Sequence, residues 1–122
     1  MAIETGSINQ LREPIITIRL SDDLFVDYVV DTGFSGGLML PAETLKRAKI
    51  SRVGKETVEL VSGHFFIANI ALVEIEWLSA RRFVRVVISE THDALIGAEL
   101  LDGNRLSIDY IANTVLLTDE AI

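Results

Sequence analysis

A single Asp-Thr-Gly sequence is the feature of this 122-residue chain best suited to chemistry. Asp31, Thr32 and Gly33 directly follow the apolar residues 28–30. At such a place a carboxylate lies on a turn beside a dry core, where burial and hydrogen bonding adjust it to acid–base work. Asp-Xaa-Gly is also common turn chemistry, because Gly adopts backbone angles that other residues avoid. Asp31 is therefore a candidate catalytic carboxylate, and its context must decide between the two interpretations.

A second segment, further along the chain, carries another suggestive pattern. Residues 94–101 read Ala-Leu-Ile-Gly-Ala-Glu-Leu-Leu, with Leu95 and Ile96 before Gly97 and a short helical stretch after it. By itself this pattern is typical of a core strand followed by a helix. It predicts packing rather than chemistry when it is taken alone.

Residues 33–37 also spell Gly-Xaa-Ser-Xaa-Gly, the nucleophile-elbow pattern of α/β-hydrolases. That elbow requires a helix directly after the serine. Here Ser35 is followed by Gly36, Gly37 and the apolar residues 38–40, which predict a loop and a strand. The chain is also short for a doubly wound hydrolase, so a serine hydrolase is disfavoured.

Histidines and arginines are the remaining candidates. His92-Asp93 resembles a base with its orienting carboxylate, or a fragment of a metal site. No second ligand cluster stands at metal-binding spacing, so we predict a loop histidine and no metal. Arginines 81, 82 and 85 lie in a strand-like segment, and a solvated strand edge explains them better than phosphate recognition.

Short apolar runs separated by Gly, Asp, Asn or Ser predict the strands that position these residues. We expect hairpins over residues 14–30 and 55–77, the second turning at Ser62-Gly63, and further strands at 38–40, 81–89, 94–97, 106–110 and 114–117. One helix is expected over 41–49, with Pro41 at its first position, and one helical turn over 98–101. Such a set of short elements predicts an all-β barrel or sandwich with closed or covered edges.

Composition and charge limit the possible functions. One domain over residues 1–122 is expected for this length, and 49% hydrophobic residues are too many for disorder. Eighteen acidic residues against eleven basic ones give a net charge of −7, which disfavours nucleic acids and anionic membranes as partners. No apolar run is long enough for a membrane span, the first residues lack signal-peptide features, and cysteine is absent. We therefore expect a cytoplasmic protein.

The two segments together resemble the retropepsin-like (clan AA) aspartic proteases. Val-Asp-Thr-Gly-Phe-Ser at 30–35, with Leu-Ile-Gly-Ala-Glu-Leu-Leu at 95–101, is most similar to the small bacterial members that carry Asp-Thr-Gly-Phe. Residues 14–30 match the family's first strands, 57–67 its flap hairpin, and 106–117 its closing strands. The resemblance implies a closed barrel of short strands with a flap, and an aspartic endopeptidase that needs no cofactor.

The resemblance also implies roles for single residues. Asp31, Thr32 and Gly33 are implied to be catalytic: Asp31 activates water, Thr32 locks two loops together, and Gly33 lets the backbone approach the carboxylate. Hydrolysis of this kind needs two carboxylates. The chain has one Asp-Thr-Gly, so the active protein is expected to be a homodimer. Further implied residues are Leu95, Ile96 and Gly97 behind the catalytic loop, and Phe34, Ser62, Gly63 and His64 around an extended polypeptide substrate.

Two departures from the family pattern and one alternative function remain. Phe34 stands where viral and pepsin-type enzymes carry Ala or Ser, and a ring there is expected to narrow the substrate groove. The flap turn has only Gly63 rather than a glycine-rich tip. The terminal segments 1–13 and 114–122 are expected at the dimer interface. The alternative is a non-catalytic dimerisation or peptide-binding module of the same fold, which the intact Asp31 disfavours.

Overall fold

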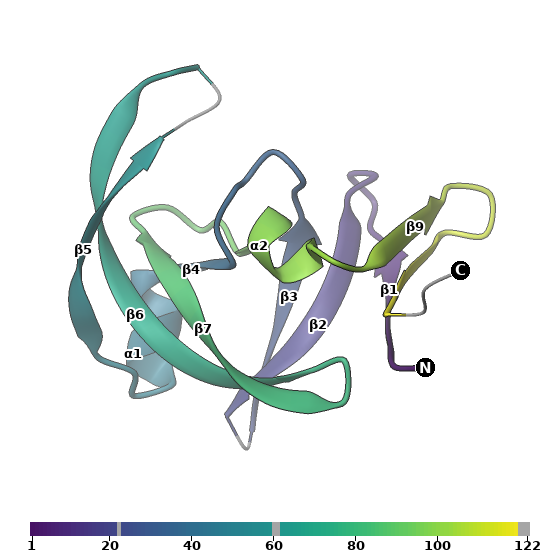
Figure 1. Cartoon of the computed structure of the whole chain (residues 1–122), viewed down its shortest axis with the longest axis horizontal. Coiled ribbons are helices and arrows are strands. Elements are labelled where there is room, and N and C mark those ends of the chain that lie inside the picture. Colours follow the sequence, from purple (N-terminus) through teal and green to yellow (C-terminus); the bar gives the residue numbers. More distant parts are fainter. Residues whose placement is uncertain (22, 60–61, 120–122) are drawn as a thin grey trace.

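Strands dominate the computed structural model, which describes residues 1–21, 23–59 and 62–119. The elements are β1 (Ile3–Ile8), β2 (Pro14–Ser21), β3 (Leu24–Val30), β4 (Leu38–Pro41), α1 (Ala42–Arg47), β5 (Arg52–Glu59), β6 (Phe65–Trp77), β7 (Ala80–Ser89), β8 (Leu95–Ile96), α2 (Ala98–Leu101), β9 (Arg105–Asp109) and β10 (Thr114–Thr118) (Figure 1). The all-β class is confirmed. β1 lies in the N-terminal segment that was expected to supply an interface strand, but the sequence patterns did not predict its bounds.

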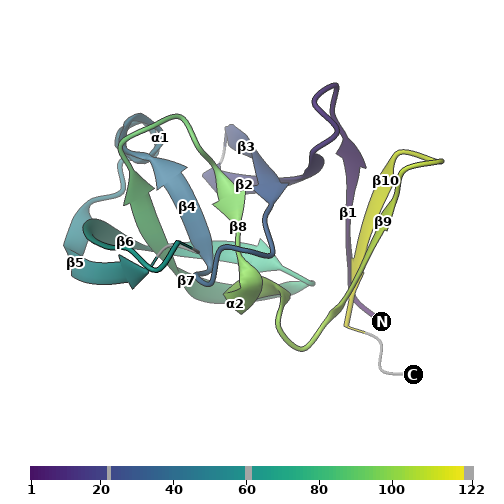
Figure 2. The same cartoon turned by 90° about the horizontal axis from the view of Figure 1, so that it is seen from above.

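All ten strands belong to one sheet, in the order β5-β6-β7-β4-β8-β3-β2-β1-β10-β9. The sheet curls on itself, so that β2 lies close to β6 although they are not neighbours in it. Figures 1 and 2 show the β5–β6 hairpin at one side of the molecule and the β9–β10 hairpin at the other. The expected closed barrel needs one correction: among the described residues, hydrogen bonds do not join β5 to β9. Strand twist brings the sheet faces together, and side-chain packing fills the space between them.

Two groups of buried side chains make the core. The larger one contains Tyr28 and Trp77, and Trp77 Nε1 donates a hydrogen bond of 3.3 Å to the carbonyl oxygen of Leu100. This bond fastens the end of β6 to α2. The smaller group, Ala68, Ile70 and Val87 with the partly buried Phe34, Met39 and Val58, lies between the β5–β6 hairpin and the loop after β3.

Local structure differs from expectation at two places. Pro41 ends β4 with extended backbone angles and caps α1, so it precedes the helix rather than opening it. β7 is not an edge strand, because it lies between β6 and β4, and its Val84 and Val86 are buried. The arginine side chains of β7 are nevertheless exposed, as expected. The sequence predicted their exposure to solvent but not which strands flank β7.

The terminal strands pair with each other inside the chain. β1 is antiparallel to β10, with Ile3 opposite Thr118, and also to β2, with Gly6 opposite Ile16. Both edges of β1 are therefore occupied. Residues 120–122, part of the expected interface segment, lie outside the described residues. None of the described helices is long and apolar enough to cross a membrane.

Glu4 gives a pH-dependent prediction for this terminal sheet. Its half-buried carboxylate faces the β6–β7 turn, where Oε2 accepts a hydrogen bond of 3.4 Å from Leu78 N. Burial raises the pKa of Glu4 above 4.5, and the nearby Glu76 adds to this, although the bond from Leu78 acts in the opposite direction. The folded state therefore binds this proton more tightly than the unfolded state, and its contribution to stability is lost as pH rises from 4.5 through the raised pKa.

We expect Glu4→Gln, which keeps the acceptor and removes the charge, to gain stability relative to the wild type across that window. The measurement is urea unfolding of both proteins between pH 4 and 7. A difference in midpoint that does not change with pH contradicts the prediction.

Candidate active site

Asp31 lies where β3 ends and the chain turns into the loop that leads to β4. Its backbone N donates to Ile96 O at 2.9 Å, its Oδ1 accepts a hydrogen bond of 2.9 Å from Gly33 N, and its carbonyl oxygen accepts one of 3.1 Å from Phe34 N. The side chain is only partly buried. The loop thus holds a carboxylate at the surface by bonds from its own backbone.

β8 and α2 form the support of this loop. β8 runs between β3 and β4, parallel to the first and antiparallel to the second. The backbone N of Gly97 donates to Gly37 O at 2.8 Å, and that of Ala98 donates to Phe34 O at 2.7 Å. The structure therefore brings together the two sequence segments, since Asp31 N is bonded to Ile96 O and Gly97 N to the loop at Gly37. Figure 2 shows β8 between β3 and β4.

Gly97 is at the tightest point of this support. A Cβ atom there would stand 2.1 Å from Gly36 O and 2.6 Å from both Phe34 O and Phe34 Cδ2. No side chain fits at such distances without moving the loop backbone. The backbone angles of Gly97 (φ −103°, ψ 178°) are ordinary extended ones, so space alone explains the glycine.

A groove opens between the Asp31 loop and the β5–β6 hairpin. Its cavity of about 370 Å³ is lined by residues 34–37 from the loop, by residues 56–59 and Phe65 from the hairpin, by Arg85 and Val87 from β7, and by Glu99 from α2. Glu56 and Arg85 form an ion pair in its wall. The sequence analysis proposed only Phe34 among these residues. The alternation of β5 could have indicated the others, but not which strand lies opposite the loop.

Phe34 forms part of the groove floor. Its ring packs over Gly36, where an added Cβ would stand 2.7 Å from Phe34 Cζ, and it joins the smaller buried cluster. The ring therefore packs between the loop and the smaller buried cluster, and it also occupies part of the groove.

We expect Phe34→Ala to lower the free energy of unfolding by about 2 kcal/mol, below the usual range for a fully buried Phe because the ring is only partly buried. Phe34→Leu retains most of the contact and is expected to lose less. Urea unfolding of both variants tests this, and equal midpoints for Phe34→Ala and the wild type refute it.

The expected flap residues lie at the end of the hairpin and not in the groove wall. Ser62, Gly63 and His64 are exposed, Ser62 Oγ and His64 Nδ1 are 3.0 Å apart, and Gly63 has a positive φ of 85°. Residues 60 and 61 of the expected flap lie outside the described residues. The roles assigned to Ser62, Gly63 and His64 therefore stay predictions.

Within the part of the chain that the structure describes, no other side chain bonds to the Asp31 carboxylate. It forms no ion pair there, and the exposed Thr32 side chain makes no hydrogen bond with the described residues. No described group of three or more acidic or histidine side chains is placed to hold a metal ion. One carboxylate can bind and orient water, but a second group is needed to polarise a substrate carbonyl.

The alternative nucleophile and base lack the necessary geometry. Ser35 is followed by a bend and by β4, where an elbow requires a helix. Asp93 Oδ2 accepts a hydrogen bond of 2.7 Å from Thr91 Oγ1, whereas His92 has no bond to it among the described residues. Among the described residues, neither Ser35 nor His92 therefore belongs to a catalytic pair.

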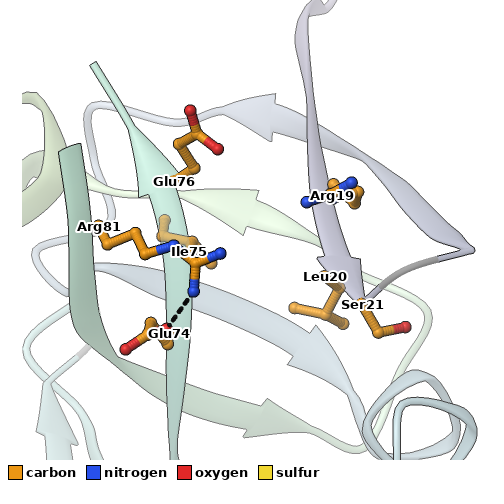
Figure 3. Close-up of a pocket in the computed structure, with 7 residues that line it drawn as sticks. All are labelled: Arg19, Leu20, Ser21, Glu74, Ile75, Glu76 and Arg81. Carbon is orange, nitrogen blue, oxygen red and sulfur yellow. Dashed lines mark hydrogen bonds and ion pairs between the residues drawn. The ribbon is translucent and has the colours of Figure 1, made fainter. Parts of the chain in front are cut away.

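Another pocket, of about 190 Å³, lies between β2 and the β6–β7 hairpin. It is lined by Arg19, Leu20, Ser21, Glu74, Ile75, Glu76 and Arg81 (Figure 3). Arg81 Nη1 and Glu74 Oε1 are 2.9 Å apart; the Arg81 side chain is largely exposed and that of Glu74 partly so. The β2 residues of this pocket lie beside the start of β3, whereas Asp31 follows its end. This pocket is therefore separate from the Asp31 groove and carries a solvated ion pair.

Solved structures define the class of fold. EIAV protease, in complex with the inhibitor HBY-793, is 19% identical to this chain, with a TM-score of 0.58 over 78% of this chain and 90% of that one. The foamy viral protease–reverse transcriptase, in complex with an RNA/DNA hybrid, is 14% identical to this chain, with a TM-score of 0.53. The match covers 71% of this chain but only 11% of the foamy viral chain. No family model matches the sequence, and no curated protein matches it. The chain has the retropepsin-like fold of retroviral proteases.

Proposed function

We propose that this protein is an aspartic endopeptidase, in which two Asp31 carboxylates of a homodimer hydrolyse peptide bonds in extended polypeptides. The observation that carries the proposal is the placement of Asp31. It stands at the end of β3 on a loop fastened to β8 and α2, and residues 34–37 of this loop line a groove whose wall includes residues of the β5–β6 hairpin. The Asp-Thr-Gly-Phe sequence at residues 31–34, which resembles that of small bacterial retropepsin-like proteases, supports the same assignment.

The chemistry follows from two facing carboxylates that share one proton. Two such groups about 3 Å apart do not both ionise easily. The ionised one accepts a proton from water as the water oxygen attacks the peptide carbonyl carbon, and the protonated one donates a hydrogen bond to the carbonyl oxygen. Collapse of the tetrahedral intermediate breaks the C–N bond and delivers a proton to the leaving nitrogen. The carboxylates perform every proton transfer, so no cofactor is required.

The groove suits a substrate in strand conformation. An extended peptide can add its backbone to the β5–β6 hairpin and place alternate side chains toward Phe34 and Val58. Polypeptide is the partner proposed besides the second chain, and the net charge of −7 argues against a nucleic acid. The cytoplasm stays the predicted location.

The test is digestion of a mixed library of unstructured peptides by the full chain between pH 3 and 7, with products identified by mass spectrometry. We expect internal cleavage that is favoured at mildly acidic pH and declines as the shared proton is lost. The Asp31→Asn protein, purified in parallel, detects contaminating proteases. Wild type and variant equally inert over the whole range would leave the non-catalytic module as the function.

A further inference from the structure

The end of the sheet at β9 is open to another strand. β9 pairs on one side with β10, and no described strand pairs with its other side. An unpaired strand edge is a template for a further strand. We propose that a second copy of this chain docks here, with the two β9 strands antiparallel about a two-fold axis at Ser107. This inference rests on the dimeric peptidase proposed above.

The sequence of β9 is complementary to itself in this arrangement. A two-fold axis at Ser107 places Arg105 opposite Asp109 of the other copy, at both ends of the pair. It also places Leu106 opposite Ile108. On either side of the self-opposed Ser107, each pair therefore matches charge with countercharge or apolar with apolar, the pairings that stabilise antiparallel strands. Shifting the axis by one residue, to Leu106 or to Ile108, opposes Arg105 or Asp109 to Ser107 and leaves the charge without a countercharge.

The charged side chains are free to make these contacts. Arg105 is exposed and forms no ion pair among the described residues. Asp109 Oδ1 accepts hydrogen bonds from Ile111 N at 2.8 Å and Ala112 N at 3.0 Å, which lower its pKa and keep it ionised. Its Oδ2 accepts no bond from the described part of the chain. The turn therefore holds the carboxylate in a fixed place and leaves one oxygen for a partner.

The opposite face of β9 supplies the apolar contact. Leu106 and Ile108 stand across from Leu117 and Val115 of β10, which are completely buried or nearly so. Ile108 is still 36% exposed although it is on this core-facing side. A second β9 would cover it and extend the core from one chain to the next.

The position of β9 connects this interface to the active site. Only residues 102–104 separate β9 from α2, and α2 binds the Asp31 loop through Ala98 N and Glu99 N. A copy docked on β9 thus approaches the chain beside the elements that hold Asp31. The edges of β1 are already occupied by β10 and β2, so the terminal strands themselves do not offer this surface.

Single cysteines test the register, because the natural chain has none. In Ser107→Cys the two thiols stand opposite each other, within disulfide reach, so mild oxidation is expected to convert most of the protein to a covalent dimer. The matched control Arg105→Cys is on the same strand and face, but its symmetry mate is about 13 Å away, and we expect at least tenfold less cross-linking. Equal cross-linking of the two variants, or none in either, overturns the register.

Charge exchange tests the same register without a cross-link. Arg105→Asp and Asp109→Arg each oppose like charges, and sedimentation should show a dimer dissociation constant at least about tenfold higher. An equimolar mixture restores both ion pairs, so the two variants should associate with each other more tightly than either does alone. Arg82→Asp on β7 makes the same charge change elsewhere and should behave as the wild type. Failure of the mixture to associate contradicts the antiparallel arrangement.

These readouts separate the interface from the proposed activity. Oxidised Ser107→Cys dimers that cleave no peptide would retain the interface and refute the peptidase. A wild type that cleaves peptides while Ser107→Cys does not cross-link would retain the peptidase and refute the interface.

Discussion

Replacing Asp31 by Asn is expected to lower peptide hydrolysis at least about 10³-fold at every pH between 3 and 7. The amide cannot accept a proton from water, and the two-carboxylate mechanism assigns that proton transfer to Asp31 and its symmetry mate alone. The effect should fall on kcat, because the groove residues that contact the substrate do not change. Single-turnover assays with an excess of enzyme measure it directly.

The fold should tolerate this substitution. The one side-chain bond of Asp31 is the 2.9 Å contact from Gly33 N to Oδ1, and an Asn oxygen can accept the same bond. We therefore expect the urea midpoint and the dimer dissociation constant to stay near the wild-type values. Asp102→Asn is the matched control, since it makes the same change in charge at an exposed residue just after α2 and should keep full activity.

Mixed dimers make the prediction specific to a shared site. Equal amounts of wild-type and Asp31→Asn chains, allowed to exchange, give active pairs in about a quarter of the dimers if assembly is random. The rate per total chain should therefore fall to about a quarter, whereas independent sites would leave half. A residual rate of one half rejects the composite site even if Asp31→Asn alone is inactive.

Much of the local structure around this site could be predicted from short patterns. The alternation of residues 14–30 predicted the β2–β3 hairpin, which delivers Asp31 to its place at the end of β3. The hairpin pattern reflects local geometry and a buried face. The role of Leu95, Ile96 and Gly97 was expected from the resemblance instead, and it stays a prediction beside the observed bonds from Asp31 N to Ile96 O and from Gly97 N to Gly37 O.

Features that depend on the sheet as a whole could not be predicted in this way. The sequence 3–8 mixes Ile with Glu, Thr, Gly and Ser, and becomes β1 because β10 and β2 flank it. The exposed arginines of β7 suggested an edge, but strand order is set by contacts distant in sequence. The groove wall at residues 56–59 was missed for the same reason: no local signal says which strand lies over the Asp31 loop.

Replacing Gly97 by Ala is expected to have the largest effect on stability of any change at the site. The new methyl group would overlap Gly36 O at 2.1 Å, and that atom belongs to the loop backbone rather than to a flexible side chain. Relief requires the loop to move away from α2, which weakens the 2.7 Å bond from Ala98 N to Phe34 O. We expect the free energy of unfolding to fall by about 3 kcal/mol or more.

The cause of this loss can be isolated, because the backbone angles of Gly97 suit alanine and only the collision remains. Gly54→Ala is the matched control: no atom lies within 4 Å of its added Cβ, so its unfolding free energy should change by less than about 0.5 kcal/mol. Urea unfolding compares the three proteins. Hydrolysis by Gly97→Ala, measured where it is still folded, should also fall, since a loop displaced by even 1 Å no longer holds Asp31 opposite its mate. A Gly97→Ala protein with the stability of Gly54→Ala would mean that α2 does not hold the Asp31 loop, and the support on which the proposed active site depends would have to be assigned elsewhere.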